Sequence, residues 1–446
     1  MDDRYVVPIN NNLPQISSDI PNKNSLNSYF PIRTKGNDFD WDAVIGIILR
    51  TLLRKKIDGY SYESFKNDCY LAFKEKLGEE SFWDVLNEMY FDQRDILSVS
   101  PEFLLFRSQK GQFEQSDARI ASMFTSMLQG MRIEKFGTRL NFIEHEILTT
   151  LSQNMRDEQV SQSIEEPYLP FLSRVFRKDL KFLSSRPKYF LSEIKQLFSF
   201  YAFSYSAQLS LSLGGWKEGD EPKSRPLYFI MDHERASSER THIKNHGYKL
   251  FQESSYRIFP MLTMLELLQP GANEKDSKKI PLWAISRRVQ DSGLETLNKD
   301  LENFAKAFCT QRELNYTFSE NSYTALDWLE QIIRIAQAQF QVGERKNINK
   351  RYVIEIEKTL ASHFIQSRGR SGRVLVLNQD YIVLLTNLVI AEAEKIRFQD
   401  LLGEFRLRGV YVDKQTEQEL IKFYDRIGNV ERMSDSGDAI YVRKTI

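Results

Sequence analysis

Apolar residues recur at helical spacing along most of the chain, and this pattern predicts a mainly α-helical protein. Asp40 precedes residues 41–57, whose apolar side chains share one face and whose basic residues collect near the end. Thr324 stands in the same position before residues 325–340, which repeat the apolar stripe. We therefore expect a helical N-terminal region and a mostly helical middle region.

Changes in composition divide the chain into three regions. A connection rich in glycine, proline and charged residues occupies residues 213–226 and follows the helical N-terminal region, 1–212. The middle region, 213–348, is predicted to be mostly helical, with the apolar run at 227–233 as a possible short buried strand. The last region, 349–446, has the clearest pattern of helix caps and turns.

Caps and turns in this last region predict three helices followed by a β-hairpin. Asn378 can cap the first helix, Asp413 can cap the third, and Gly409 permits a sharp turn before it. Val430–Met433 and Ala439–Val442 are two β-prone runs joined by Asp-Ser-Gly-Asp. This order is typical of a winged helix-turn-helix. The expected fold class is therefore mainly α, with multi-helical N-terminal and middle regions and a C-terminal winged helix-turn-helix.

The charge and cysteine content narrow the possible classes of protein. The 446 residues include 61 basic and 61 acidic side chains, so a general attraction to nucleic acid is absent, although a local basic site is compatible with this balance. Cys69 and Cys309 lie on apolar stripes, which predicts buried, reduced thiols. The start lacks a signal-peptide pattern, and no apolar run reaches the roughly 20 residues that cross a bilayer. We expect a cytoplasmic protein without a membrane partner.

Familiar catalytic motifs are absent from the sequence. It contains no Gly-x4-Gly-Lys-Ser/Thr loop, no Gly-x-Gly-x-x-Gly turn and no Gly-x-Ser-x-Gly elbow. An ATPase or a triad hydrolase is therefore not indicated. We expect no catalytic residues, no metal ion and no cofactor.

One cluster in the middle region leaves an enzymatic alternative open. Asp232 and Glu234 flank His233, while His242 and His246 stand four residues apart. No HExxH motif is present, and the neighbouring asparagine and glycine favour a loop with solvated histidines. The alternative function is a metal-dependent nuclease that uses Asp232, Glu234 and these nearby histidines.

Candidate phosphate-binding side chains lie in the last region. Arg368, Arg370 and Arg373 are separated by glycine and serine, so guanidinium groups and backbone amides could reach phosphate oxygens together. The predicted third helix and hairpin add the candidates Lys414, Gln415, Gln418, Lys422, Arg432, Arg443 and Lys444. Acidic residues nearly balance the basic ones, and Asp435 and Asp438 at the hairpin tip would repel phosphate. DNA contact and protein docking both remain open for this surface.

Three C-terminal segments carry a resemblance to a known family: RGRSGRVLVLNQDYIVLLTNL, RLRGVYVD and SDSGDAIYV. Together with PLYFIMDHERASSERTH, they resemble the DptG (DndG) family, the G component of the DNA phosphorothioation-dependent restriction system. The resemblance implies a defence protein that works with the F and H components, in which the ATPase or helicase functions lie. It also implies a role in restricting DNA that lacks backbone sulfur, and it supplies no catalytic residues.

Overall fold

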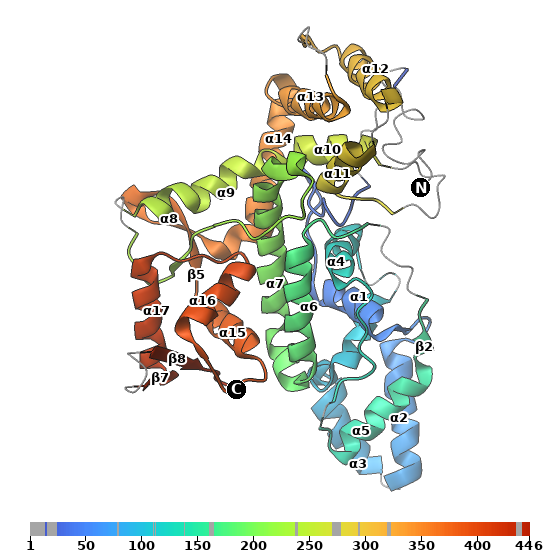
Figure 1. Cartoon of the computed structure of the whole chain (residues 1–446). Helices are drawn as coiled ribbons and strands as arrows, with labels where there is room; N and C mark the ends of the chain where they lie inside the picture. Colours follow the sequence, from blue (N-terminus) through green and yellow to red (C-terminus); the bar gives the residue numbers. More distant parts are fainter. Residues whose placement is uncertain are drawn as a thin grey trace. The chain divides into compact units, whose positions relative to one another are not determined.

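The computed structural model describes residues 14–15, 25–77, 80–109, 111, 113–137, 139–159, 165–236, 240–269, 278–292, 295–318, 323–433 and 439–446. This part of the chain is mainly helical (Figure 1), which confirms the prediction of a mainly α-helical protein. None of the helices in these ranges combines the length and the apolar character that a membrane span requires.

The residues group into two compact units. The N-terminal unit comprises Asp38–Gln162 and Phe176–Phe200, and the C-terminal unit comprises Met1–Asn37, Ser163–Val175 and Tyr201–Ile446. Helices α6 (Pro170–Ser184) and α7 (Pro187–Ser212) contribute residues to both units. Each unit is described by itself below.

Helices make up most of the N-terminal unit. They are α1 (Trp41–Leu53), α2 (Tyr62–Leu77), α3 (Glu80–Leu86), α4 (Gln115–Leu128) and α5 (Phe142–Asn154), with short helices at Asn87–Phe91, Asp95–Ser98 and Pro101–Ser108. Strands β1 (Lys55–Lys56) and β2 (Arg156–Asp157) pair antiparallel. Asp40 caps α1 by accepting a hydrogen bond from the Asp42 amide, as predicted.

A glycine allows a close contact between two helices of this unit. A Cβ atom at Gly46 of α1 would lie 2.9 Å from the Leu104 carbonyl oxygen, so only glycine permits the Pro101–Ser108 helix to approach this near. In the same unit, the aromatic rings of Phe124, Phe176 and Phe198 contact one another. All three side chains are buried and form part of the core of this unit.

The C-terminal unit contains the remaining elements. Its helices are α8 (Thr241–His246), α9 (Tyr248–Ser255), α10 (Ile258–Leu267), α11 (Leu282–Ser292), α12 (Glu295–Gln311), α13 (Ala325–Ala338), α14 (Gly343–Ile356), α15 (Gln379–Ile390), α16 (Phe398–Leu407) and α17 (Lys414–Arg426), with short helices at Leu213–Glu218, Glu357–Ala361, Ser362–Phe364 and Gly369–Ser371. Its strands are β3 (Ile230–Met231), β4 (Ile365–Ser367), β5 (Arg373–Leu377), β6 (Lys395–Arg397), β7 (Val430–Met433) and β8 (Ala439–Arg443).

These strands form two small sheets. β5 is the centre of the first sheet, antiparallel to β4 and parallel to β3, so the possible strand predicted at 227–233 is confirmed in part as β3. In the second sheet β8 pairs antiparallel with both β6 and β7. The predicted hairpin is therefore confirmed, although its turn at 434–438, with Asp435 and Asp438, lies outside the described residues.

Local signals predicted the helices around this second sheet correctly. Asn378 caps α15, Asp413 caps α17, and Gly409 has a φ of +83° in the turn between α16 and α17. A Cβ atom at Gly409 would lie 2.9 Å from the Gln208 amide nitrogen of α7, so the turn also packs closely against that helix. In Figure 1 these elements form the orange and red group that ends at the C-terminus.

The cysteines are buried and free, as predicted. Burial raises the pKa of Cys69 to about 12 and that of Cys309 to about 11. Both thiols are therefore protonated near neutral pH, which makes them poor nucleophiles.

Candidate nucleic-acid interface

Helix α17 exposes all four of the polar side chains that the sequence predicted on it for DNA contact. Lys414, Gln415, Gln418 and Lys422 are all exposed, whereas Leu420 and Tyr424 on the opposite face are buried. The Glu417 side chain is buried, and its carboxylate accepts a hydrogen bond of 2.8 Å from Lys414. The helix is thus amphipathic, with a polar outer face.

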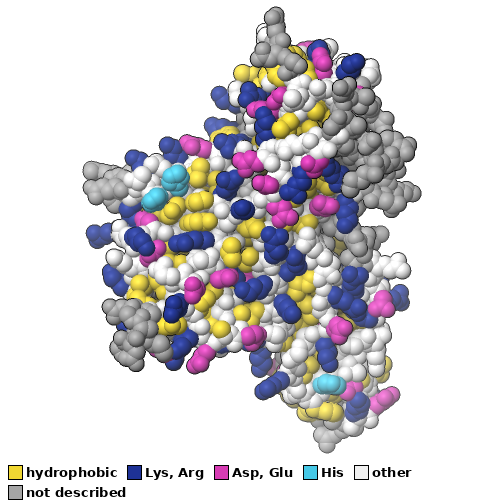
Figure 2. All heavy atoms as spheres, in the orientation of Figure 1, with side chains coloured by type: hydrophobic (Ala, Val, Ile, Leu, Met, Phe, Trp, Pro, Cys, Tyr) yellow, Lys and Arg dark blue, Asp and Glu magenta, His cyan; other side chains and the backbone are white. Residues whose placement is uncertain are grey.

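The basic residues of this surface are paired with acidic neighbours. Lys414 binds Glu417 and Lys422 binds Glu419, each three residues away on α17 and each at 2.8 Å. On the hairpin, Arg432 lies 2.8 Å from Asp425 and Arg443 lies 2.5 Å from Glu431. The other predicted residue, Lys444, donates to the Ala391 carbonyl at 3.0 Å. Basic and acidic side chains accordingly alternate on the visible face of this region (Figure 2).

The predicted arginine loop is the connection between β4 and β5, where Gly369 and Gly372 both have positive φ angles. Arg368 is half-buried and donates a hydrogen bond to the Asp232 carbonyl. Arg373 forms a 2.8 Å ion pair with Glu357 and stacks over the Tyr248 ring at 4.5 Å. The side chain of Arg370 is outside the described part. The loop therefore uses two of its three arginines within the fold.

One segment holds both the arginine loop and α17, and we call it the strap: residues 224–240, of which 224–236 and Arg240 are described. Tyr411, just before α17, exchanges backbone hydrogen bonds of 3.0 and 2.8 Å with Leu227 and Phe229 of the strap. Further along, the strap accepts the hydrogen bond from Arg368, and Ser371 donates to the Ala236 carbonyl at 2.9 Å. The structure thus brings the two predicted groups onto the same segment.

A buried charge network fixes the strap to the first turn of α17. Arg240, with a side chain only 6% exposed, donates to the Glu234 carboxylate and, at 2.9 and 2.5 Å, to both oxygens of Asp413. Arg240 also donates to the Thr416 hydroxyl at 2.7 Å, and that hydroxyl donates to Glu234 at 2.9 Å. Every charged group in this network has a partner, as buried charges require.

Asp413 has two roles in the network, because it caps α17 and binds Arg240. Burial by itself would raise its pKa, but the Arg240 hydrogen bond, the Thr416 amide and the positive charge outweigh that effect and hold the pKa below its usual value. Burial by itself would lower the pKa of Arg240, but the hydrogen bonds to Asp413 and Glu234 and the negative charges of both carboxylates raise it. The pair therefore stays charged throughout the neutral pH range.

The histidine cluster has a different structure from the predicted loop. His242 and His246 lie on α8, so the loop interpretation was wrong; both are exposed, and the His242 ring stacks on Tyr228 with centroids 4.8 Å apart. Glu234, a residue of the nuclease alternative, is committed to the buried network. Within the described ranges no group of three or more His, Cys, Asp or Glu side chains is arranged to hold a metal ion.

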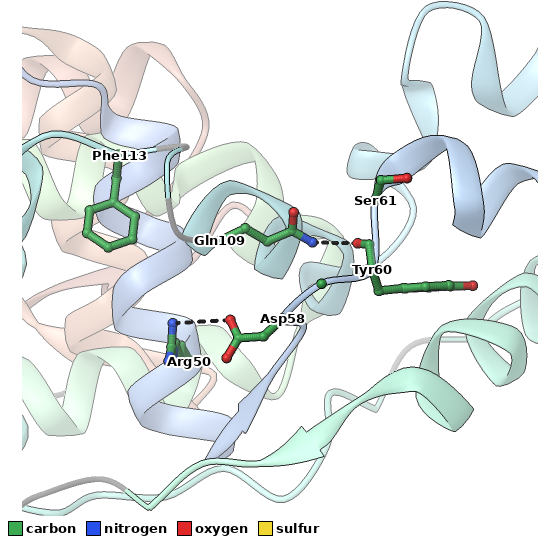
Figure 3. Close-up of a pocket in the computed structure, with 7 residues that line it drawn as sticks. Arg50, Asp58, Tyr60, Ser61, Gln109 and Phe113 are labelled. Carbon is green, nitrogen blue, oxygen red and sulfur yellow. Dashed lines mark hydrogen bonds and ion pairs between the residues drawn. The ribbon is translucent and has the colours of Figure 1, made fainter.

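A separate cavity of about 720 Å³ lies in the N-terminal unit (Figure 3). Arg50 lines this cavity, and its guanidinium lies 4.0 Å from the Asp58 carboxylate and donates at 3.1 Å to both oxygens of Glu158. Gln109 donates to the Tyr60 carbonyl at 2.7 Å. The Tyr60 hydroxyl binds Asp68 at 2.7 Å. The charged groups of this cavity already have partners, so its lining offers no evident means of binding an anion.

No protein-family model matches this chain, and no curated protein sequence matches it either. The resemblance to the DptG (DndG) family therefore stays a prediction that rests on the segments quoted above.

Proposed function

We propose that the protein is a non-catalytic, DNA-contacting subunit of a DNA phosphorothioation-dependent restriction complex. In this proposal it acts in the cytoplasm with the F and H components and restricts DNA that lacks the phosphorothioate modification. DNA would meet the outer face of α17, the β7–β8 hairpin and the arginine loop.

The observation that carries the proposal is the order and pairing of the last elements. Three helices with a glycine turn before the third, followed by a hairpin whose second strand also pairs with β6, fit the winged helix-turn-helix arrangement. In that arrangement the third helix presents its polar face to DNA. The exposed Lys414, Gln415, Gln418 and Lys422 are of the types that bind phosphates and base edges.

The ion pairs on this surface are compatible with DNA contact. Lys414 is 85% exposed but its partner Glu417 is buried, whereas Lys422 is 70% exposed and its partner Glu419 is 26% exposed. An exposed pair such as Lys422–Glu419 is worth only about 0–1 kcal/mol, so a phosphate could displace Glu419 from Lys422 at small free-energy cost. The buried network differs, because it holds α17 in place and leaves its outer face unchanged.

A DNA-binding measurement tests the proposal on α17. The double variant Lys414→Gln/Lys422→Gln removes two exposed cations without touching the buried network. We expect it to weaken binding to duplex DNA and to reduce the slope of log affinity against log salt by about 2, since each phosphate contact contributes about 0.9. Fluorescence anisotropy with a labelled duplex at several salt concentrations gives both quantities.

The matched control is Lys306→Gln/Arg334→Gln. These two cations are also exposed and paired with a glutamate one helical turn away, on α12 and α13. The control variant should leave the affinity for duplex DNA and the salt slope close to those of the unchanged protein. Equal effects of the two double variants, or no effect of either, would contradict DNA contact by α17.

A further inference from the structure

A cavity of about 610 Å³ lies beside α14 and is lined by three exposed cations with no acidic residue among its lining side chains. The cations are Arg257, which precedes α10, and Lys346 and Lys350, one turn apart on α14. Within the described ranges none of these three side chains makes an ion pair or a hydrogen bond. This distinguishes them from the lysines and arginines of α17 and of the hairpin, which are paired.

The remaining lining suits a nucleobase better than a simple anion. Tyr256 is 40% exposed at the cavity, and Gln337, Gln341 and Asn347 add amide groups that can both donate and accept hydrogen bonds. Asn349 is the buried polar residue of the lining: its Nδ2 donates to the Tyr256 carbonyl at 2.9 Å, which steadies the backbone that carries the tyrosine ring. Sites that bind unpaired nucleic-acid strands combine aromatic rings with neighbouring cations.

A smaller cavity on α14 extends the positive character of this region. Its volume is about 140 Å³, it shares Phe340 with the larger cavity, and its lining includes Arg312 and Arg345 but no acidic residue. Burial, and then the charge of Arg345, lower the pKa of Arg312. The Arg312 Nε atom is buried without a hydrogen-bond partner in the described structure. Uncompensated cations that repel one another are stabilised when an anion binds between or beside them.

We propose that the larger cavity binds one phosphate-bearing nucleotide unit of an unpaired nucleic-acid strand. Arg257, Lys346 and Lys350 contact the phosphate, while Tyr256 and the amide side chains contact the base. An unpaired strand fits because the bases of a duplex are stacked and paired inside the helix, where a concave pocket cannot reach their faces. This site is separate from the surface proposed above for duplex DNA, and it goes beyond that function.

The test uses the full chain, a labelled 12-nucleotide single strand and the duplex of the same sequence. In the variant Arg257→Gln/Lys346→Gln/Lys350→Gln, we expect single-strand affinity to fall at least about tenfold and the salt slope to decrease by about 0.7, the contribution of one phosphate contact to a single strand. The charge-keeping variant Arg257→Lys/Lys346→Arg/Lys350→Arg should remain within a few-fold of the unchanged protein. Tyr256→Ala should weaken binding of the single strand and leave binding of the duplex unchanged.

A matched control removes the same charge elsewhere in the C-terminal unit. Lys223, Arg288 and Lys299 are exposed and lie outside both linings, so changing all three to glutamine should alter single-strand affinity less than about twofold. Equal losses in the cavity and control variants would overturn the proposal, as would unchanged affinity in the cavity variant. It would also be overturned if a free 5′-mononucleotide bound as tightly as the strand, because the cavity would then be a site for small nucleotides.

The result is distinguishable from a failure of the proposed function. Lys414→Gln/Lys422→Gln tests duplex binding by α17, and the cavity variant tests single-strand binding beside α14. Loss in one measurement with no change in the other assigns the effect to one surface.

Discussion

The buried network at the start of α17 allows a quantitative prediction for Arg240→Met. The substitution keeps an unbranched apolar side chain but removes the cation from between Glu234 and Asp413, whose side chains are 3% and 13% exposed. Each carboxylate keeps a hydrogen-bond donor, because Thr416 donates its hydroxyl to Glu234 and its amide to Asp413, and the Met231 amide also donates to Glu234. Neither keeps a compensating charge. Removing one partner of a buried ion pair destabilises a protein by about 3–5 kcal/mol, and we expect a value in this range.

The appropriate assay measures α17 and the strap directly. The chain contains two compact units that need not unfold together, so one midpoint for the whole chain would mix their transitions. Native-state hydrogen exchange, read on peptides from α17 and from the strap, reports the free energy of opening of those segments. Opening of both segments should become easier in Arg240→Met by about the expected free energy.

Two further variants separate a buried charge effect from a general one. Arg334→Met removes an arginine that is 60% exposed and paired with Glu330, and it should change stability by less than about 1 kcal/mol. Combining Arg240→Met with Glu234→Leu and Asp413→Asn removes every charge of the network and retains a capping side chain, so it should recover most of the loss. The reasoning is refuted if Arg240→Met alone stays within 1 kcal/mol of the unchanged protein in α17.

Two other predictions follow from the same region. Gly409→Ala should destabilise the protein by more than about 1 kcal/mol in urea unfolding, because the φ of Gly409 is +83° and the new Cβ would meet Gln208. The control is Gly403→Ala in α16, where the structure leaves open space around the glycine. This substitution should be neutral or stabilising by up to about 1 kcal/mol. Because the pKa of Asp413 is lowered in the folded state, its stabilising contribution is complete above its unfolded pKa of about 3.9 and is lost as the pH falls through the lower folded value. Asp413→Asn should therefore show a shallower loss of stability below about pH 4 in acid titrations followed by circular dichroism. A steeper acid loss, or a stabilising Gly409→Ala, would contradict these arguments.

Sequence patterns predicted the parts of the fold that depend on neighbouring residues. A helix cap requires an oxygen and an amide only two or three residues apart, so Asp40, Thr324, Asn378 and Asp413 were all identified correctly. The hairpin was equally local, since its two strands are joined by a short turn. These features need no knowledge of distant contacts.

Features that depend on distant residues could not be predicted in this way. β5 was not identified: its parallel partner β3 lies far earlier in the chain, although its antiparallel partner β4 is only a few residues away. Glu234 looked like a candidate metal ligand because nothing in its neighbourhood indicates Asp413 or Thr416 as partners. His242 and His246 were assigned to a loop, since a six-residue helix leaves too short a periodic signal. The α14 cavity was also missed, because the cations that line it come from segments that are separate in the sequence.

The pattern of ion pairs gives information that net charge does not. The chain has equal numbers of acidic and basic side chains. On α17 and the hairpin this balance is also local, because the candidate lysines and arginines there form ion pairs with nearby glutamates and aspartates. Beside α14 the balance fails locally, and three cations line a cavity without an acidic side chain. A cluster of like charges raises the free energy of the fold unless something else compensates it. Among the residues that the structure describes, the α14 cavity therefore has an electrostatic reason to bind an anion, even though the sequence shows no basic motif there.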